Sequence, residues 1–449
     1  MIGPKYSRSP RSQIGPENPK PQLASDKTLP NRRQFVHQTI AALSGLSVLG
    51  GSLDNPLAPV DALAAPAATE ELNVIGPYGR WAASLTEKTP PSLSLRSGRW
   101  KDLDSWHPAA RTRTLERMGV PEIGATPVVT VHKQYSYDGL HIEELSWQLP
   151  YGRATGAILL KPQGATKPLP GILAFHDHGG NKYFGRRKIT RTSAERHSLI
   201  EYHQDQYYEG RAWANEVAKR GYVVLVSDAF PFESRRVLLS DVPEQLRRGL
   251  NDDNPEDPEN IEAYNQWAGD HESIMAKSLF CAGTTWPGVF YAEDIKALDV
   301  LCAREDVDSE RIGCGGLSGG GMRTVFTGGL DPRIKCAVCV GFMTTWKDFL
   351  LNKSFTHTWM TYVPLLPREL DFPEILGLRV PLPTLVLNDA GDFLYTMPEM
   401  TRADEILAEI YAKAGAAEHY KCSFYPGPHK FDIPMQEEAF AWYDKWLKD

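Results

Sequence analysis

Short apolar runs that alternate with helical segments constrain the fold of this chain more than any other feature of its sequence. The clearest runs lie at 170–175, 222–227, 334–341 and 383–387. Each is long enough to cross a sheet once and lacks polar alternation, which is typical of strands buried on both faces. The segments 293–305 and 400–414 instead have apolar residues at helical spacing. We therefore predict a mostly parallel central sheet with helices on both faces.

The sequence predicts one large α/β domain, residues 126–449, preceded by a weakly patterned N-terminal extension, residues 65–125. The domain should begin with antiparallel strands, because short segments with period-two alternation follow each other closely from 128 to 160. Two stretches, 233–285 and 342–374, are too long for ordinary connections. We interpret them as inserted cap segments over the sheet, the first of them acidic and irregular.

The strand predicted at 311–314 ends in a glycine-rich turn, Gly316-Leu-Ser-Gly-Gly320, and a helical segment follows at 322–326. A Gly-x-Ser-x-Gly pattern between a strand and a helix is typical of the nucleophile elbow of serine hydrolases. Glycine suits these positions because side chains beside the strained serine would collide with the strand and the helix. The alternative is a tight turn or a phosphate-binding loop without catalytic function.

Three residues with complementary chemistry follow strands of the predicted sheet. Ser318 follows the elbow strand, Asp392 follows the strand at 383–387, and His429 follows the strand at 420–425. The carboxyl ends of parallel strands share one edge of a sheet, so we expect these residues to meet. The chain order Ser, Asp, His is that of the α/β-hydrolase fold, which is the predicted fold class. His429 would remove the serine proton during attack, and Asp392 would orient the imidazole and stabilise its charge.

The acid and the base of this set both have alternatives. Asp389 lies at the same strand end as Asp392 and could be the acid in its place. We favour Asp392 because Asp392-Phe-Leu-Tyr, followed by Pro398, resembles the loop that carries the acid in related hydrolases. His429 could be a surface loop histidine, but its position at a strand end favours the catalytic interpretation.

The predicted oxyanion hole consists of two backbone N–H groups. One belongs to Gly319, directly after the nucleophile, and the other to His178, in the loop after the strand that ends at Phe175. His176 and His178 could instead be a metal-binding pair, but no third ligand follows at a suitable spacing, so we predict no metal and no cofactor. The candidates for the substrate pocket are His176, Trp286, His357 and Trp359, of which the last three could instead belong to the core.

Residues 1–64 have the order of a removable export signal. Arg32 and Arg33 precede an apolar run rich in Ala, Gly and Ser, 39–53, and small residues suited to cleavage follow at 62–67. Twin arginines followed by Gln-Phe resemble a Tat signal, which implies the Tat export machinery as a partner and a periplasmic or secreted mature protein. The run is too short and too rich in glycine for a stable membrane span, although a retained signal anchor is the alternative.

Charge and cysteine content exclude several classes of function. The net charge of −7 provides no basic field for nucleic acid. Six cysteines in 449 residues are too few for a disulfide scaffold. Cys336 and Cys339 form a C-x-x-C pattern that could indicate a redox or zinc site. They lie in a predicted strand, where residues three apart point to opposite faces, so core packing is the better interpretation.

Four motifs of the chain resemble an exported bacterial α/β-hydrolase family that is grouped with dienelactone hydrolases and acetyl xylan esterases. They are Phe175-His-Asp-His-Gly-Gly180, Gly283-Thr-Thr-Trp-Pro-Gly288, the elbow and its strand, and His429-Lys-Phe431. The resemblance covers roughly residues 125–448 and implies the fold and the triad. Dienelactone hydrolases use a cysteine nucleophile, whereas this chain has Ser318, which favours ester hydrolysis over lactone chemistry.

These observations predict a cofactor-independent serine esterase that cleaves carboxylic esters through an acyl-enzyme at Ser318. The expected substrates are small-molecule or oligosaccharide esters with short acyl groups, such as acetylated xylan fragments. One alternative is a serine peptidase of the prolyl oligopeptidase type, against which the absence of a propeller-length N-terminal repeat region counts. Another is a non-catalytic binding protein on a hydrolase scaffold, against which the complete Ser, Asp and His set counts.

Overall fold

The computed structural model describes residues 72–86 and 90–448, which belong to one compact unit, Glu70–Asp449. The predicted signal region, residues 1–64, lies outside the described residues.

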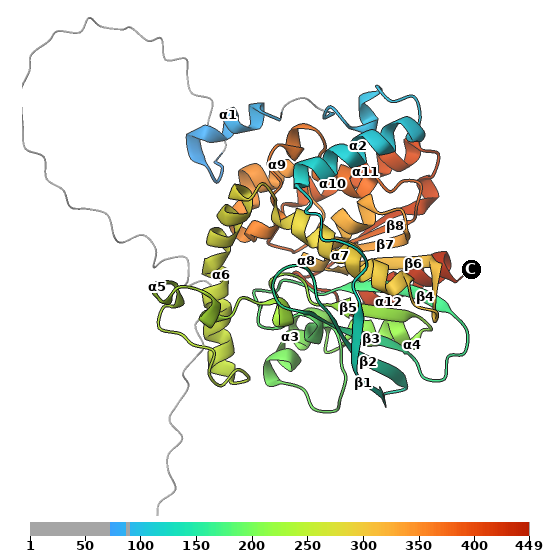
Figure 1. Cartoon of the computed structure of the whole chain (residues 1–449). Coiled ribbons are helices and arrows are strands. Elements are labelled where there is room, and N and C mark those ends of the chain that lie inside the picture. The colour runs from blue at the N-terminus through green and yellow to red at the C-terminus, as the bar shows by residue number, and fades with distance from the viewer. Residues whose placement is uncertain (1–71, 87–89, 449) are drawn as a thin grey trace, which may run out of the picture. The chain divides into compact units, whose positions relative to one another are not determined.

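A mixed sheet with the strand order β1-β2-β3-β5-β4-β6-β7-β8-β9 forms the centre of this unit (Figure 1). The strands are β1 (Val129–Tyr137), β2 (Leu140–Trp147), β3 (Thr155–Pro162), β4 (Leu169–Phe175), β5 (Val223–Ser227), β6 (Val307–Leu317), β7 (Ile334–Val340), β8 (Thr384–Asp389) and β9 (Tyr420–Tyr425). The pairs β1–β2, β2–β3 and β3–β5 are antiparallel, and the pairs from β5 through β4 to β9 are parallel. The predicted antiparallel entry into a mostly parallel sheet is therefore confirmed.

Helices cover both faces of the sheet and bury two separate apolar clusters. The helices are α1 (Gly79–Ser84), α2 (Leu103–Met118), α3 (Ser198–Tyr208), α4 (Trp213–Lys219), α5 (Glu244–Arg247), α6 (Pro258–Cys281), α7 (Trp286–Cys302), α8 (Gly319–Arg323), α9 (Trp346–Asp348), α10 (Phe372–Gly377), α11 (Met397–Lys413) and α12 (Ile433–Leu447). Residues of α2, α7, α10 and α11 bury one face, and residues of α3, α4 and α12 bury the other. Successive strand residues alternate between the clusters, so Cys336 and Cys339 lie on opposite faces, as predicted, and both are free thiols.

The insert at 233–285 is not irregular as predicted, because α6 occupies 24 of its residues. Asp257 caps this helix by accepting bonds from the N–H groups of Glu259 and Asn260, and Pro258 starts it. Its buried residues keep a helical spacing, but acidic and amide residues between them hide the pattern in the sequence. The predicted start of the next helix, residue 293, is also wrong. α7 begins at Trp286, because Thr285 caps it.

The second insert, 342–374, consists mainly of short helical turns and lies in the connection between the end of β7 and the start of β8. One of them is the 3-10 turn η10 (Trp359–Thr361), which packs against α6 and α7. Within the N-terminal extension, α2 packs into the core through Trp106, whose indole N–H donates to Leu93 O at 2.7 Å. In the described part of the chain, no helix combines the length and apolarity needed to cross a membrane.

Candidate active site

Ser318 occupies a sharp turn between β6 and α8, with φ 57° and ψ −117°. The glycines around it are explained by the end of β4, which passes close to the turn. A Cβ at Gly316 would lie 2.3 Å from Phe175 O, and a Cβ at Gly320 would lie 2.4 Å from the same atom. Any other residue would therefore push β4 away from the elbow. This geometry fits a nucleophile elbow and leaves Ser318 only partly buried at the carboxyl edge of the sheet.

Asp392 and His429 contact each other at the same edge. His429 Nδ1–H donates to Asp392 Oδ2 at 2.6 Å, and Leu394 N–H donates to Asp392 Oδ1 at 2.9 Å. A carboxylate can only accept here, so Nδ1 carries a proton and Nε2 is the ring nitrogen left for another partner. Nε2 is buried and has no hydrogen-bond partner among the described residues.

The His429 ring lies next to the elbow strand. Ser318 N–H donates to Val340 O at 2.9 Å, and the following residue, Gly341, separates the ring from Leu317. A Cβ at Gly341 would lie 2.9 Å from His429 Cε1 and 3.1 Å from Leu317 Cδ1. The structure thus brings Asp392 and His429 into contact and places the ring beside the elbow, but no hydrogen bond joins His429 to Ser318. Such bonds often form only when substrate is bound.

Asp389, the alternative acid, makes a different contact. Its Oδ2 accepts the backbone N–H of Lys430 at 3.0 Å, and it forms no hydrogen bond with the imidazole. Burial raises the pKa of Asp389 to about 7, so this carboxyl is a poor permanent anion. The geometry favours Asp392 as the partner of His429.

The loop after β4 brings the backbone of His178 to the elbow. A Cβ at Gly319 would lie 2.9 Å from His178 N, so this backbone nitrogen lies against the residue after the nucleophile. The loop then turns through Gly179 and Gly180, whose φ angles are 52° and 67°. The backbone nitrogen of His178 therefore lies beside the residue that follows the nucleophile, which is where the second donor of the predicted oxyanion hole is expected.

The two loop histidines have structural hydrogen bonds. His176 Nδ1–H donates to Asp177 O at 3.0 Å, and its Nε2 accepts Ala229 N–H at 3.2 Å. His178 Nε2–H donates to Glu272 at 2.8 Å, and its Nδ1 accepts Gly180 N–H at 3.0 Å. Within residues 72–86 and 90–448, no group of three or more His, Cys, Asp or Glu side chains is arranged to hold a metal ion.

A small cavity adjoins the two amides, and only one of the predicted pocket residues, His176, lines it. Its other lining residues include Phe232, Phe290, Met322, Arg323 and Met360. Trp286 is 1% exposed and packs against Phe230 in the core. His357 donates to Leu394 O at 3.0 Å and packs against Phe349, while the Trp359 side chain is 44% exposed. The apolar lining comes from four elements: the loop after β5 with Ala229 and Phe232, α7 with Phe290, α8 with Met322, and the second insert with Met360.

Glu272 of α6 is a residue of this region that the sequence did not indicate. Besides His178, it accepts Thr358 Oγ1–H at 2.6 Å and pairs with Lys182 at 2.5 Å. Burial opposes its negative charge, but the bond from His178 and the charge of Lys182 hold the pKa of Glu272 below its ordinary value. This one carboxylate therefore connects the loop after β4, α6 and η10.

The comparisons with known proteins agree with the fold. No family model matches the chain. A relative from Bacillus subtilis (strain 168), named "Putative hydrolase YtaP", is 26% identical over 309 residues, which are 68% of this chain and 88% of that protein. A structure from Bacteroides fragilis NCTC 9343, named a "putative acetyl xylan esterase", has a TM-score of 0.57 at 18% identity and covers 78% of this chain and 82% of its own. A glucuronoyl esterase from Solibacter usitatus has a TM-score of 0.52 at 15% identity and covers 79% and 96%. The predicted α/β-hydrolase fold is confirmed.

Proposed function

We propose that this protein is a serine esterase that cleaves carboxylic esters with Ser318, His429 and Asp392. The observation that carries the proposal is the 2.6 Å bond from His429 Nδ1 to Asp392, which leaves Nε2 buried and without another partner among the described residues, in a ring that lies beside the elbow. An imidazole in this state can accept the proton of a hydroxyl that attacks a carbonyl carbon.

The reaction follows from the positions of these groups. Ser318 Oγ attacks the acyl carbon while His429 Nε2 takes its proton, and the N–H groups of Gly319 and His178 stabilise the negative oxygen. His429 then protonates the departing alcohol, which leaves an acyl group on Ser318. A water molecule, deprotonated by the same nitrogen, attacks this ester and releases the acid. Asp392 stabilises the imidazolium in both steps.

The substrates that we propose are short acyl esters of carbohydrates. The cavity beside these two residues is small, and two Phe and two Met side chains are among its lining, which suits an acetyl group better than a long acyl chain. The names of the Bacteroides and Solibacter structures, a putative acetyl xylan esterase and a glucuronoyl esterase, point to esters of carbohydrates. The relation to the exported family that includes dienelactone hydrolases rests on four motifs, those of the loop after β4, of 283–288, of the elbow and of 429–431.

The N-terminal sequence supports export through a Tat-type signal to the periplasm or the medium. The signal lies in residues 1–64 and contains Arg32 and Arg33. Export would bring the enzyme to polymeric substrates that do not enter cells. Replacing both arginines by lysine should leave the full-length protein in the cytoplasm, as fractionation and immunoblotting would show; unchanged export would refute a Tat route.

An ester panel tests the function. The panel varies acyl length from acetyl to octanoyl on p-nitrophenol, and it includes acetylated xylo-oligosaccharides and one peptide substrate. The wild-type protein should prefer acetyl esters, and Ser318→Ala should remove turnover and labelling by a fluorophosphonate probe. Turnover in Ser318→Ala would refute the mechanism. Peptide cleavage would favour a peptidase, and a folded wild-type protein that the probe fails to label would favour a binding protein.

A further inference from the structure

A buried lysine lies beneath the proposed oxyanion hole. Lys188 ends the 3-10 turn η4 (Arg186–Lys188) and is 0% exposed. Its Nζ donates to Asp177 O at 2.6 Å and to His178 O at 3.0 Å. No step of the proposed reaction uses this ammonium group, yet burying it in the protein interior is costly.

The peptide group that Lys188 contacts is the one whose nitrogen, His178 N, lies against Gly319 of the elbow. The carbonyl of Asp177 and the amide of His178 belong to the same planar unit, so fixing the oxygen also fixes the direction of the N–H. That oxygen accepts two hydrogen bonds, from Lys188 Nζ and from His176 Nδ1 at 3.0 Å. Bonds to the carbonyl oxygen also polarise the peptide and make its N–H a stronger donor.

We propose that Lys188 is a positioning residue of the oxyanion hole. Its ammonium holds the carbonyl side of the Asp177–His178 peptide, directs the N–H of His178 toward the position of the oxyanion and strengthens that N–H as a donor. This role rests on the proposed function.

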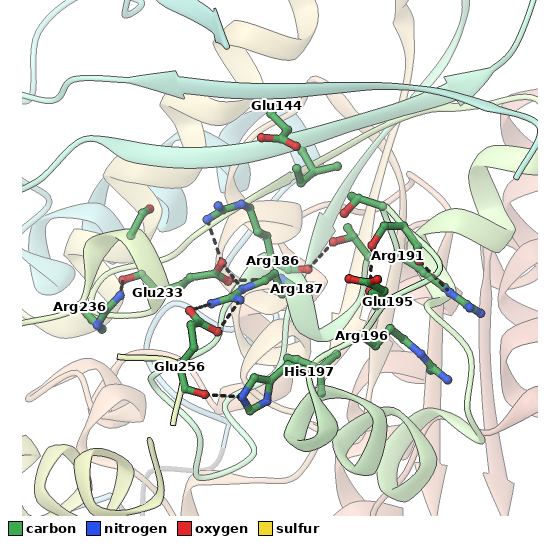
Figure 2. Close-up of a pocket in the computed structure, with 16 residues that line it drawn as sticks. Glu144, Arg186, Arg187, Arg191, Glu195, Arg196, His197, Glu233, Arg236 and Glu256 are labelled. Carbon is green, nitrogen blue, oxygen red and sulfur yellow. Dashed lines mark hydrogen bonds and ion pairs between the residues drawn. The ribbon is translucent and has the colours of Figure 1, made fainter. Parts of the chain in front are cut away.

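Salt bridges hold the turn that carries Lys188. Arg187 Nε pairs with Glu233 at 2.8 Å, and Arg186 N–H donates to Asp228 at 2.8 Å while its guanidinium pairs with the same carboxylate. Figure 2 shows Arg186 and Arg187 beside Glu233 and Glu256, where they line a polar pocket. The two arginines thus anchor one side of η4, and the lysine extends from it toward the loop after β4.

The surroundings of Lys188 permit the charged form near neutral pH. Asp177 Oδ2 lies 3.7 Å from Nζ, and the other oxygen of Asp177 accepts His203 Nε2–H at 3.0 Å and Tyr208 O–H at 2.6 Å. Burial lowers the pKa of Lys188 to about 8, although Asp177 opposes this shift. The titratable groups around Nζ are Asp177, His176, His178 and Lys182 from the loop after β4, His203 and Tyr208 from α3, and Glu233 from the 3-10 turn η5 (Glu233–Arg235). The ammonium charge is therefore lost as the pH rises through about 8.

Two substitutions separate the charge of Lys188 from its packing. Lys188→Met keeps the length of the side chain without charge, and Lys188→Arg keeps a charge that persists to high pH. The full-length proteins are compared with p-nitrophenyl acetate from pH 6 to pH 10. In Lys188→Met, kcat should fall on the order of 10- to 100-fold with a KM within about twofold, because the oxyanion forms only during reaction. Lys188→Arg should recover part of kcat, and its kcat should fall at a higher pH than kcat of the wild type does.

The control is Lys182→Met, which removes a second buried lysine of the same loop. Lys182 is 2% exposed and pairs with Glu272 rather than with the Asp177–His178 peptide. In this variant kcat should still fall at alkaline pH, but at a higher pH than in the wild type, because a like charge near Lys188 is gone.

The outcomes separate this inference from the proposed function. If the wild type hydrolyses the ester and Ser318→Ala does not, a Lys188→Met protein with kcat within twofold of the wild type refutes the role of Lys188 alone. The role of Lys188 is also refuted if kcat of Lys188→Arg falls at the same alkaline pH as kcat of the wild type. This comparison holds even where Lys188→Met does not fold. Turnover in Ser318→Ala would overturn the proposed function and this role with it.

Discussion

The assignment of the acid gives the sharpest test, because the two candidate carboxylates lie at one strand end and differ in their contacts. In Asp392→Asn, the amide can present an N–H₂ group to His429 Nδ1, which then carries the lone pair while Nε2 carries the proton. Nε2 can no longer accept the proton of Ser318. A wrong tautomer of this kind lowers kcat on the order of 10⁴-fold, which corresponds to about 5.5 kcal/mol.

The matched control is Asp389→Asn. Asparagine keeps an oxygen that can accept the N–H of Lys430, which is the contact that Asp389 makes at 3.0 Å. His429 keeps its partner Asp392 in this variant. We therefore expect kcat to fall less than about 10-fold.

The assay is the initial rate of p-nitrophenyl acetate hydrolysis at pH 7.5, with active sites titrated by a fluorophosphonate probe. Circular dichroism and thermal unfolding establish that both variants fold. A large loss in Asp389→Asn together with near-normal turnover in Asp392→Asn would refute the assignment. Equal losses in both variants would refute the argument that only the direct partner of His429 matters.

Three further experiments test the elbow, the contact of Glu272 with the loop after β4, and the titration of Asp389. Gly320→Ala should lower the free energy of unfolding by about 2 kcal/mol or more, because the new Cβ would lie 2.4 Å from Phe175 O. The control is Gly269→Ala in α6, where the new Cβ meets open space, so this change should be neutral or stabilising. Denaturant unfolding measures both variants. Glu272→Gln should lower kcat/KM about 10-fold, because Lys182 loses its counter-ion. The control is Glu262→Gln on the exposed side of α6, which should leave kcat/KM unchanged. Equal kcat/KM values in the two variants would contradict the anchoring role of Glu272. Because burial raises the pKa of Asp389 to about 7, the wild type loses stability as the pH rises from about 4 to about 7, and Asp389→Asn should lack this loss in unfolding measured at pH 5 and pH 8.

The sequence predicted the sheet well because buried parallel strands are continuous apolar runs. It also predicted that Asp392 and His429 meet at one edge of the sheet, where they are in contact, because each follows a predicted strand, and the glycines of the elbow mark the turn at Ser318. The long helix α6 was not recognised, because the residues between its buried positions are acidic or amide-bearing and include a glycine.

Lys188 and Glu272 could not be identified for a different reason. Lys188 follows two arginines and reads as part of a solvated basic stretch, yet it is 0% exposed. Glu272 lies 94 residues from its partner His178. Their roles depend on contacts made only in the folded chain, and a single sequence has no pattern that reports such contacts.

The position of Glu272 has a consequence for attempts to redesign substrate range. This carboxylate belongs to α6, accepts a bond from Thr358 at the start of η10 and holds the ring of His178. Replacing α6 alone with a segment from another protein would remove a support of the loop after β4. Thr358 and Met360 line the cavity beside the elbow, and Glu272 joins this segment to that loop, so a graft that reshapes the cavity should transfer α6 and the 354–361 segment as one block.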